Sequence, residues 1–220
     1  MKNVIFIAPP AAGKGTLSDY LVENMGYTHI STGDILRKKS HEDTELGRNI
    51  ATLLKSGTFI GDDIILPLFK EELLKFKDKP FILDGMPRNL EQAAYLEDLF
   101  LELGVDNYVV MHIDVPEEML EKRAVGRRIC DTCKSSYNIY FDGFQPKENN
   151  VCDKCHTELI QRSDDTLETF KERYYTYLKV TEPLLQFYES KGKVKVLDAS
   201  KSSLEIIGAM LTLLESSAND

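Results

Sequence analysis

Residues 4–17 constrain the fold more than any other part of this chain. Residues 4–7 form a short apolar run of β-branched and aromatic side chains, which predicts a strand buried on both faces. Residues 8–15 are a loop of mostly small residues, and the pattern turns helical from Thr16. A strand, a tight loop and a helix N-terminus in this order predict a phosphate site, because backbone N–H groups and the helix dipole both attract an anion.

Two side chains in this stretch suit a nucleotide phosphate chain. Lys14 can place a positive charge on the outer phosphates, and the hydroxyl of Thr16 can hold Mg²⁺. The general pattern Gly-x-x-x-x-Gly-Lys-Ser/Thr is matched imperfectly, because Ala8 replaces its first glycine and Gly15 separates Lys14 from Thr16. Ala11 also stands where glycine would be easier if the backbone needs a positive φ. Taken alone, the stretch could be an ordinary strand–turn–helix unit.

Charge and hydropathy limit the ligands and the compartment. The 220 residues include 27 Lys and Arg against 36 Asp and Glu, and the net charge of −9 argues against a general nucleic-acid or membrane-surface binder. A polyanionic ligand would therefore need locally gathered positive charge, and five of the arginines do gather between residues 123 and 173. The chain has no apolar run long enough for a membrane span and no signal-peptide core, so we expect it in the cytoplasm.

A second candidate site begins at residue 31. Residues 31–34, Ser-Thr-Gly-Asp, head an amphipathic helix, where such residues are ordinary caps. Arg37 lies one turn further on and could reach an anion at that N-terminus.

Helices are also predicted over residues 44–55 and 64–75, the second capped by Asp62 or Asp63. Residues 31–60 then form a small helical insertion between core elements.

The apolar run at residues 81–83 predicts a strand that ends in Asp84. A carboxylate at the carboxyl end of a strand suits the orientation of Mg²⁺-bound water. Gly85 permits a close backbone approach, and Arg88 and Gln92 follow. Asp84 and Gly85 alone could be a turn, but the residues that follow favour a site.

Further strands are predicted at residues 27–30, 108–114 and 193–197, and further helices at 90–103, after Pro116, at 166–190 with a break at Pro183, and at 204–214. The helix after Pro116 would carry Arg123 and Arg127 on one face, four residues apart. Like charges at that spacing repel, so the pair predicts a shared anion, unless it is only a solvated basic helix end.

A capping box is predicted from Asp165 and Glu168 at the start of the helix over residues 166–190.

Two cysteine pairs predict a metal site. Cys130 and Cys133, and Cys152 and Cys155, form two Cys-x-x-Cys motifs separated by 18 residues. Four soft ligands at this spacing favour zinc, and four thiolates leave no open position, so the site should be structural. The polar, turn-rich residues 134–151 between the pairs resemble a small β ribbon that could barely fold without the metal.

These motifs together resemble those of the adenylate kinases, in their long-lid, zinc-bearing bacterial form, within the nucleoside monophosphate kinase family of P-loop proteins. The resemblance runs almost from end to end and rests on Ala-Pro-Pro-Ala-Ala-Gly-Lys-Gly-Thr, Ser-Thr-Gly-Asp, Leu-Asp-Gly-Met-Pro-Arg, Arg-Ala-Val-Gly-Arg-Arg, the cysteine pairs and Arg-Ser-Asp-Asp. The Lys-Gly-Thr spacing is normal in that family. A zinc ribbon alone would explain neither the first loop nor Asp84 and Arg88.

The resemblance implies an α/β fold, a doubly wound parallel sheet with helices on both faces. It implies a core of residues 1–30, 61–126 and 165–220, a helical insertion at 31–60 that binds the nucleoside monophosphate, and a lid at 127–164 that carries the zinc site. The implied activity is the reversible transfer of the terminal phosphoryl group of Mg·ATP to AMP, giving two ADP, by a monomer. The alternatives are a weak or silent nucleotide-binding homologue and a kinase for another nucleoside monophosphate.

The resemblance also assigns roles to residues. The implied contacts with ATP are Ala11, Ala12, Gly13, Lys14, Gly15, Thr16, Arg123, Arg127, Ser136, Tyr137 and Lys201. The implied contacts with AMP are Thr32, Gly33, Arg37, Gly57, Thr58, Phe59, Ile60, Gly85, Met86, Pro87, Arg88, Gln92, Arg162 and Arg173, with Gln92 reading the adenine edge. The implied catalytic set is Lys14, Asp84, Arg88, Arg127, Arg162 and Arg173, a cage of cations around the transferring group. Ala8, Ala11, Met86 and Ala199 depart from the family pattern, and ATP affinity would suffer if Ala11 cannot adopt the required backbone.

Overall fold

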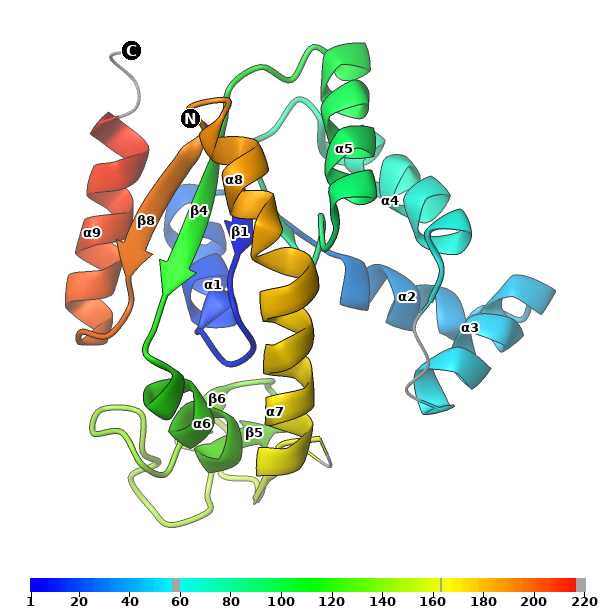
Figure 1. Cartoon of the computed structure of the whole chain (residues 1–220). Coiled ribbons are helices and arrows are strands. Elements are labelled where there is room, and N and C mark those ends of the chain that lie inside the picture. The colour runs from blue at the N-terminus through cyan, green and yellow to red at the C-terminus, as the bar shows by residue number, and fades with distance from the viewer. Residues whose placement is uncertain (57–59, 163, 217–220) are drawn as a thin grey trace.

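The computed structural model describes residues 1–56, 60–162 and 164–216. Within these residues a sheet of five parallel strands runs in the order β2-β3-β1-β4-β8. The strands are β1 (Asn3–Ile7), β2 (Thr28–Ser31), β3 (Phe81–Asp84), β4 (Tyr108–Asp114) and β8 (Val194–Asp198). Helices lie on both sides of this sheet (Figure 1).

The central strands are buried on both faces because alternate side chains enter two separate apolar layers. On one face, Val4 and Phe6 pack with α1 (Lys14–Met25), α6 (Glu117–Gly126) and α9 (Ser203–Ser216). On the other face, Ile5 and Ile7 pack with α4 (Asp62–Phe76), α5 (Leu90–Leu103) and α8 (Pro183–Glu189). The predicted doubly wound parallel sheet is confirmed.

The helices α2 (Thr32–Ser40) and α3 (Glu45–Ser56) follow β2 and project away from the sheet (Figure 1). Ser31 caps α2 by accepting a hydrogen bond from the Asp34 backbone N–H at 3.4 Å, as predicted. The prediction that Asp62 or Asp63 caps α4 is wrong, because Gly61 is the N-cap residue and no side chain caps this described helix. The Asp62 carboxylate instead accepts a hydrogen bond from Gln92.

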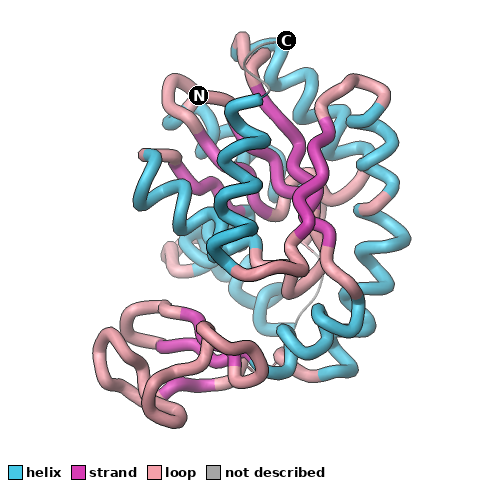
Figure 2. Tube along the Cα trace, turned by 90° about the vertical axis from the view of Figure 1, so that its left-hand side faces the viewer, coloured by secondary structure: helices cyan, strands magenta, loops and turns pink. Residues whose placement is uncertain are grey.

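A second, antiparallel sheet has the strand order β6-β5-β7 within the described residues. Its strands are β5 (Arg127–Cys130), β6 (Ser136–Asn138) and β7 (Leu159–Ile160). Figure 2 shows this sheet and its loops as a separate lobe beyond the end of the larger sheet. The β ribbon predicted between the cysteine pairs is therefore only partly strand, since much of residues 139–150 is turn and bend.

The predicted placement of Arg123 and Arg127 on one helix face is wrong. Helix α6 ends at Gly126, and Arg127 has the extended angles φ −64° and ψ 137° that begin β5. A Cβ on Gly126 would lie 2.5 Å from the Tyr140 ring and 2.6 Å from the Asn138 side-chain oxygen, so only glycine fits at this helix end. Glycine is also a poor helix former.

One long helical column runs from α7 (Leu167–Thr176) through a π-helical turn (Tyr177–Thr181) into α8 (Figure 1). The predicted break at Pro183 takes this form because proline has no N–H for the helical ladder. The Glu182 backbone N–H reaches back five residues to the Tyr177 carbonyl oxygen at 2.9 Å.

The predicted capping box of Asp165 and Glu168 is wrong. Thr166 caps α7 and accepts from the Thr169 N–H. The Asp165 carboxylate instead accepts hydrogen bonds from the Arg127 guanidinium.

Among the described helices, none combines the length and the apolar character that crossing a bilayer requires.

The first loop contains an unusual backbone angle. Ala11 has φ +63°, in the left-handed region, and Ala12 does not share it. That conformation costs an L residue about 1–2 kcal/mol, whereas the added freedom of glycine in the unfolded chain costs about 0.4–1 kcal/mol.

We therefore expect Ala11→Gly to raise the free energy of unfolding by about 0.5–1 kcal/mol in urea denaturation, because strain relief exceeds the entropy cost. Ala12→Gly is the matched control and should be destabilising, since Ala12 is buried and not at a positive φ. A loss of stability in Ala11→Gly would contradict this account of the loop.

Candidate nucleotide site and metal centre

The first loop joins the carboxyl end of β1 to the N-terminus of α1. Gly13 is the N-cap residue at φ +96°, and no side chain caps this described helix end. Arg123 crosses from α6 and donates to the carbonyl oxygens of Ala12 at 3.2 Å and Ala199 at 2.9 Å. The free N–H groups of the first turn and the Lys14 ammonium are thus available to an anion at this point.

Asp84 lies beside this loop. It ends β3, where it is in register with Phe6 of β1 and Ser31 of β2. The His29 Nε2 atom lies 3.5 Å from its carboxylate. Burial would raise the pKa of Asp84, but the interactions with His29 and Lys14 outweigh burial and hold that pKa below its ordinary value.

The predicted cations are gathered around Lys14. Burial is the largest cause that lowers the pKa of the Lys14 ammonium, Asp84 opposes it, and the positive charges of Arg173, Arg88 and Arg127 lower it further. Burial also lowers the pKa of the Arg162 guanidinium, and the adjacent Arg127 adds to this effect. Five separate segments therefore bring mutually repelling cations to the end of the sheet, which favours a polyanionic ligand there.

The Arg88 side chain is fixed by hydrogen bonds within its own loop. Its Nε donates to the Gly85 carbonyl oxygen at 2.8 Å, and Thr32 Oγ1 donates to the same oxygen at 3.2 Å. Gly85 has φ +83°, and a Cβ there would lie 2.6 Å from Thr32 Oγ1, so this position requires glycine. The Gln92 amide is held between the Arg88 backbone N–H and Asp62.

Three other predicted arginines are paired with carboxylates. The ion pairs are Arg37 with Asp34, Arg127 with Asp165 and Arg173 with Asp164. The pair of Arg127 and Asp165 is the most buried of the three, and it joins the start of β5 to the segment before α7. Since these acids are close neighbours, phosphates would have to compete with them for the arginines.

Several predicted nucleotide contacts have side chains that point elsewhere. The Ile60 side chain packs in the apolar cluster between α2, α3 and α4. The Met86 side chain packs in the apolar layer between the sheet and α5. The Tyr137 hydroxyl lies 3.4 Å from Cys152 Sγ and accepts from the Asp153 N–H. Lys201 is exposed and lies 3.8 Å from Asp198. The predicted contacts Gly57, Thr58 and Phe59 lie outside the described residues.

The other predicted nucleotide contacts lie on α1, on α2, on β6 and in the loop after β3. Gly15 and Thr16 are in the exposed first turn of α1, Gly33 is in the first turn of α2, and Ser136 begins β6. The peptide bond between Met86 and Pro87 is cis.

The four cysteines are positioned to hold a metal ion. Their Sγ atoms all lie within 4.8 Å of one another. The separations are 3.2 Å between Cys130 and Cys155, 3.5 Å between Cys133 and Cys152, and 3.6 Å between Cys133 and Cys155. A tetrahedral zinc ion with Zn–S bonds of about 2.3 Å places its sulfurs about 3.8 Å apart, so the residues fit such an ion.

Neighbouring donors favour the thiolate form of Cys130 and Cys152, whereas the pKa of Cys155 is raised to about 11. A hydrogen bond from the Cys133 backbone N–H is the largest cause that lowers the pKa of the Cys130 thiol, and Thr157 adds to it. The Tyr137 hydroxyl lowers the pKa of Cys152 in the same way. Such outer contacts orient metal ligands, so Tyr137 supports the metal centre whatever else it binds.

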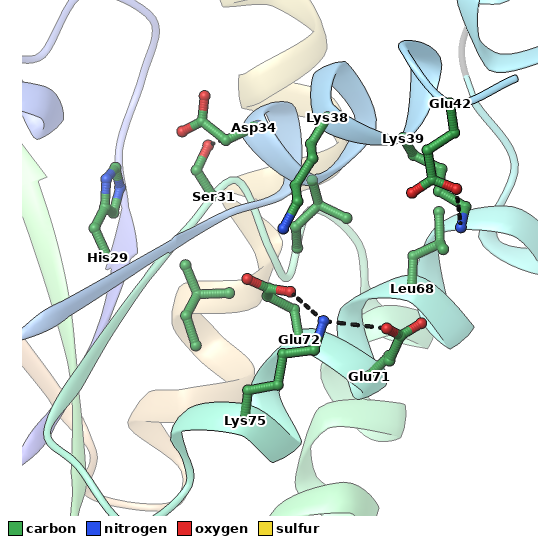
Figure 3. Close-up of a pocket in the computed structure, with 12 residues that line it drawn as sticks. His29, Ser31, Asp34, Lys38, Lys39, Glu42, Leu68, Glu71, Glu72 and Lys75 are labelled. Atoms are coloured by element: carbon green, nitrogen blue, oxygen red, sulfur yellow. Dashed lines mark hydrogen bonds and ion pairs between the residues drawn. The ribbon is translucent and has the colours of Figure 1, made fainter. Parts of the chain in front are cut away.

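A polar pocket of about 150 Å³ lies between α2 and α4 (Figure 3). The Lys75 ammonium donates hydrogen bonds there to Glu71 and Glu72, and Lys39 forms an ion pair with Glu42. Its lining residues include His29 and Asp34 but none of the predicted nucleotide contacts. The pocket reaches the candidate site only through His29, which also contacts Asp84.

Two residues that contact the candidate site, Asp62 and His29, were not among its predicted members. A lone histidine in a strand is usually structural, and only the pairing of β2 with β3 brings it to Asp84. Asp62 looked like a helix cap, and no local signal links it to Gln92, 30 residues away.

Comparison with known proteins agrees with this geometry. The family model described as adenylate kinase matches residues 6–193. The chain belongs to the adenylate kinase family. An adenylate kinase of Archaeoglobus fulgidus is 42% identical over 200 residues, which cover 90% of this chain and 91% of the relative.

Two other adenylate kinases are similar in sequence to this chain to a comparable degree. That of Bacillus pumilus is 38% identical over 96% of this chain and 97% of its own length. That of Acetivibrio thermocellus is 41% identical over 87% of this chain and 88% of its own length. The family membership thus extends over nearly the whole chain.

The contact between His29 and Asp84 predicts a pH-dependent contribution to stability. Burial would lower the pKa of His29, but Asp84 outweighs burial and raises it above 6.5, while the pKa of Asp84 lies below 3.8. The contribution of His29 to the free energy of unfolding is complete below pH 6.5 and is lost as the pH rises through its raised pKa. The aspartate contribution is present above pH 3.8 and is lost as the pH falls through the lowered value.

We expect His29→Gln to cost about 1 kcal/mol of unfolding free energy near pH 5.5 and less near pH 8.5, measured by urea denaturation. His41→Gln, which alters an exposed histidine, is the control. Equal losses at both pH values in His29→Gln would show that the ion pair is not the cause.

Proposed function

We propose that this protein transfers the terminal phosphoryl group of Mg·ATP to AMP and forms two ADP, reversibly, and so balances the adenine nucleotides. The observation that carries the proposal is the set of cations around Lys14. Burial and then the charges of Arg173, Arg88 and Arg127 lower the pKa of its ammonium, and Asp84 opposes them. A site of this kind gains stability from a phosphate chain, and the family gives that chain its identity as nucleotide.

The chemistry requires positioning and positive charge and no general base. Phosphoryl transfer passes through a state in which charge is spread over three equatorial oxygens, so fixed cations stabilise it most. Lys14, Arg88, Arg127, Arg162 and Arg173 would supply these cations.

The two substrates would enter from opposite sides of this cage. ATP phosphates would lie on the first loop at residues 11–16, with Arg123 holding that loop. AMP would lie by Thr32, Gly85, Arg88 and Gln92, which are joined by hydrogen bonds in one loop.

Asp84 and Thr16 would hold Mg²⁺, which neutralises phosphate charge when bound. Asp84 suits this role because its pKa is held low, so it presents ionised oxygen ligands, which Mg²⁺ prefers. The arginines now paired with Asp34, Asp164 and Asp165 would exchange these partners for phosphates as residues 31–60 and 127–164 close over the core. Closure would exclude water, which could otherwise accept the phosphoryl group.

We also propose that the four cysteines hold one structural zinc ion per chain and that the protein acts as a cytoplasmic monomer, without nucleic-acid or membrane partners. The thiolate-favouring contacts of Cys130 and Cys152 and the close sulfur spacing support zinc. Metal analysis of the purified protein should give one equivalent of zinc, and the absence of a bound metal would overturn the assignment.

The silent homologue suggested by Ala8 and Ala11 is disfavoured, since Ala11 adopts the positive φ that the loop needs. A kinase for another monophosphate is tested with AMP, CMP, UMP and GMP as acceptors. ADP formation from ATP and AMP supports the proposal, and no turnover with any of the four acceptors would overturn it.

Arg88→Ala should lower kcat by about 10²–10³-fold, because it removes one cation that faces the transferring group. Coupled assay of ADP formation measures this. Arg48→Ala is the matched control, since Arg48 is exposed and pairs with Asp43 away from the site, so it should leave kcat unchanged. A similar rate in Arg88→Ala and wild type would remove Arg88 from the cage.

A further inference from the structure

The side-chain amide of Gln92 is held at both ends by groups of fixed hydrogen-bonding sense. The Arg88 backbone N–H donates to Gln92 Oε1 at 2.7 Å, and Gln92 Nε2 donates to Asp62 Oδ1 at 2.6 Å. A backbone N–H can only donate, and an ionised carboxylate can only accept. The amide therefore has one orientation, because turning it over would set donor against donor and acceptor against acceptor.

This orientation decides what Gln92 can offer a base. One lone pair on Oε1 and one proton on Nε2 remain available. Gln92 is only 3% exposed, so a base that reaches it must satisfy these groups itself. Adenine presents an amino donor at position 6 and an acceptor at the neighbouring ring nitrogen. Hypoxanthine and guanine present an oxygen acceptor and an N–H donor at the same two places.

We propose that Asp62 is a positioning residue that acts through Gln92 and makes the acceptor site select adenine over 6-oxopurines. The inference rests on the proposed function, because it assumes that Gln92 faces the acceptor base. Asp62 is the first residue of α4, so the start of this helix and the Arg88 loop are joined by a single amide. Without the carboxylate, only the Arg88 N–H would oppose turning of the amide.

The test compares AMP with inosine monophosphate, which differs only in the oxygen at position 6 and the proton on the ring nitrogen. The measured quantity is the ratio of kcat/KM for AMP to kcat/KM for inosine monophosphate, with Mg·ATP as donor. In Asp62→Leu we expect this ratio to fall by about tenfold or more, the value of a hydrogen bond to a charged group. Asp62→Asn keeps an oxygen acceptor and should restore most of the ratio.

Asp63→Leu is the matched control, because it removes an exposed carboxylate from the same helix turn. Its ratio should equal that of wild type. An equal fall for both acceptors in Asp62→Leu, an unchanged ratio, or the same change in Asp63→Leu would overturn the inference. If Asp62→Leu does not fold, Asp62→Ala replaces it with the same expectations.

The two proposals fail in different ways. A wild-type protein that phosphorylates none of the monophosphates overturns the proposed function. A wild-type protein that converts AMP, together with an unchanged acceptor ratio in the Asp62 variants, overturns only the role of Asp62.

Discussion

The fold gathers cations that repel one another at the end of the parallel sheet. A chain with net charge −9 places Lys14 within the electrostatic reach of Arg88, Arg127 and Arg173, with Asp84 as the opposing charge. Such an arrangement is unfavourable by itself, because burial and repulsion both act against the charged form of Lys14. A phosphate chain would offset this repulsion, which is why we propose that substrate binds here.

The fold supplies these cations from elements that are distant in sequence and hold one another in place. Arg88 is fixed by Gly85 and by Thr181, whose hydroxyl donates to the Arg88 carbonyl oxygen at 3.1 Å from the π-helical turn. That turn belongs to the same helical column as Arg173. Arg127 begins the strand that ends at Cys130, so the metal centre and the cage share β5. A metal that stiffens the small lobe therefore also limits the movement of Arg127.

The sequence was sufficient for the parallel sheet, the tight loop between β1 and α1 and the cysteine cluster, because each depends on local pattern: buried strands, a tight turn and paired cysteines. It was insufficient where a distant partner decided the outcome. Asp165 resembled a cap because its neighbours form a capping pattern, but Arg127, 38 residues away, takes its carboxylate. Arg127 itself fitted a helix face, but α6 ends at Gly126 and Arg127 begins β5. Likewise, Asp62 gained its role from Gln92 and not from the helix it begins.

We propose that one continuous cationic site binds the phosphates of two nucleotides. The most direct test is calorimetric titration with a dinucleotide whose two adenosines are joined by five phosphates, alone and in the presence of ATP or AMP. We expect one molecule bound per chain, with its binding weakened by each nucleotide separately and by Arg88→Ala. Binding of two molecules per chain, or binding that one of the two nucleotides leaves unchanged, would contradict it.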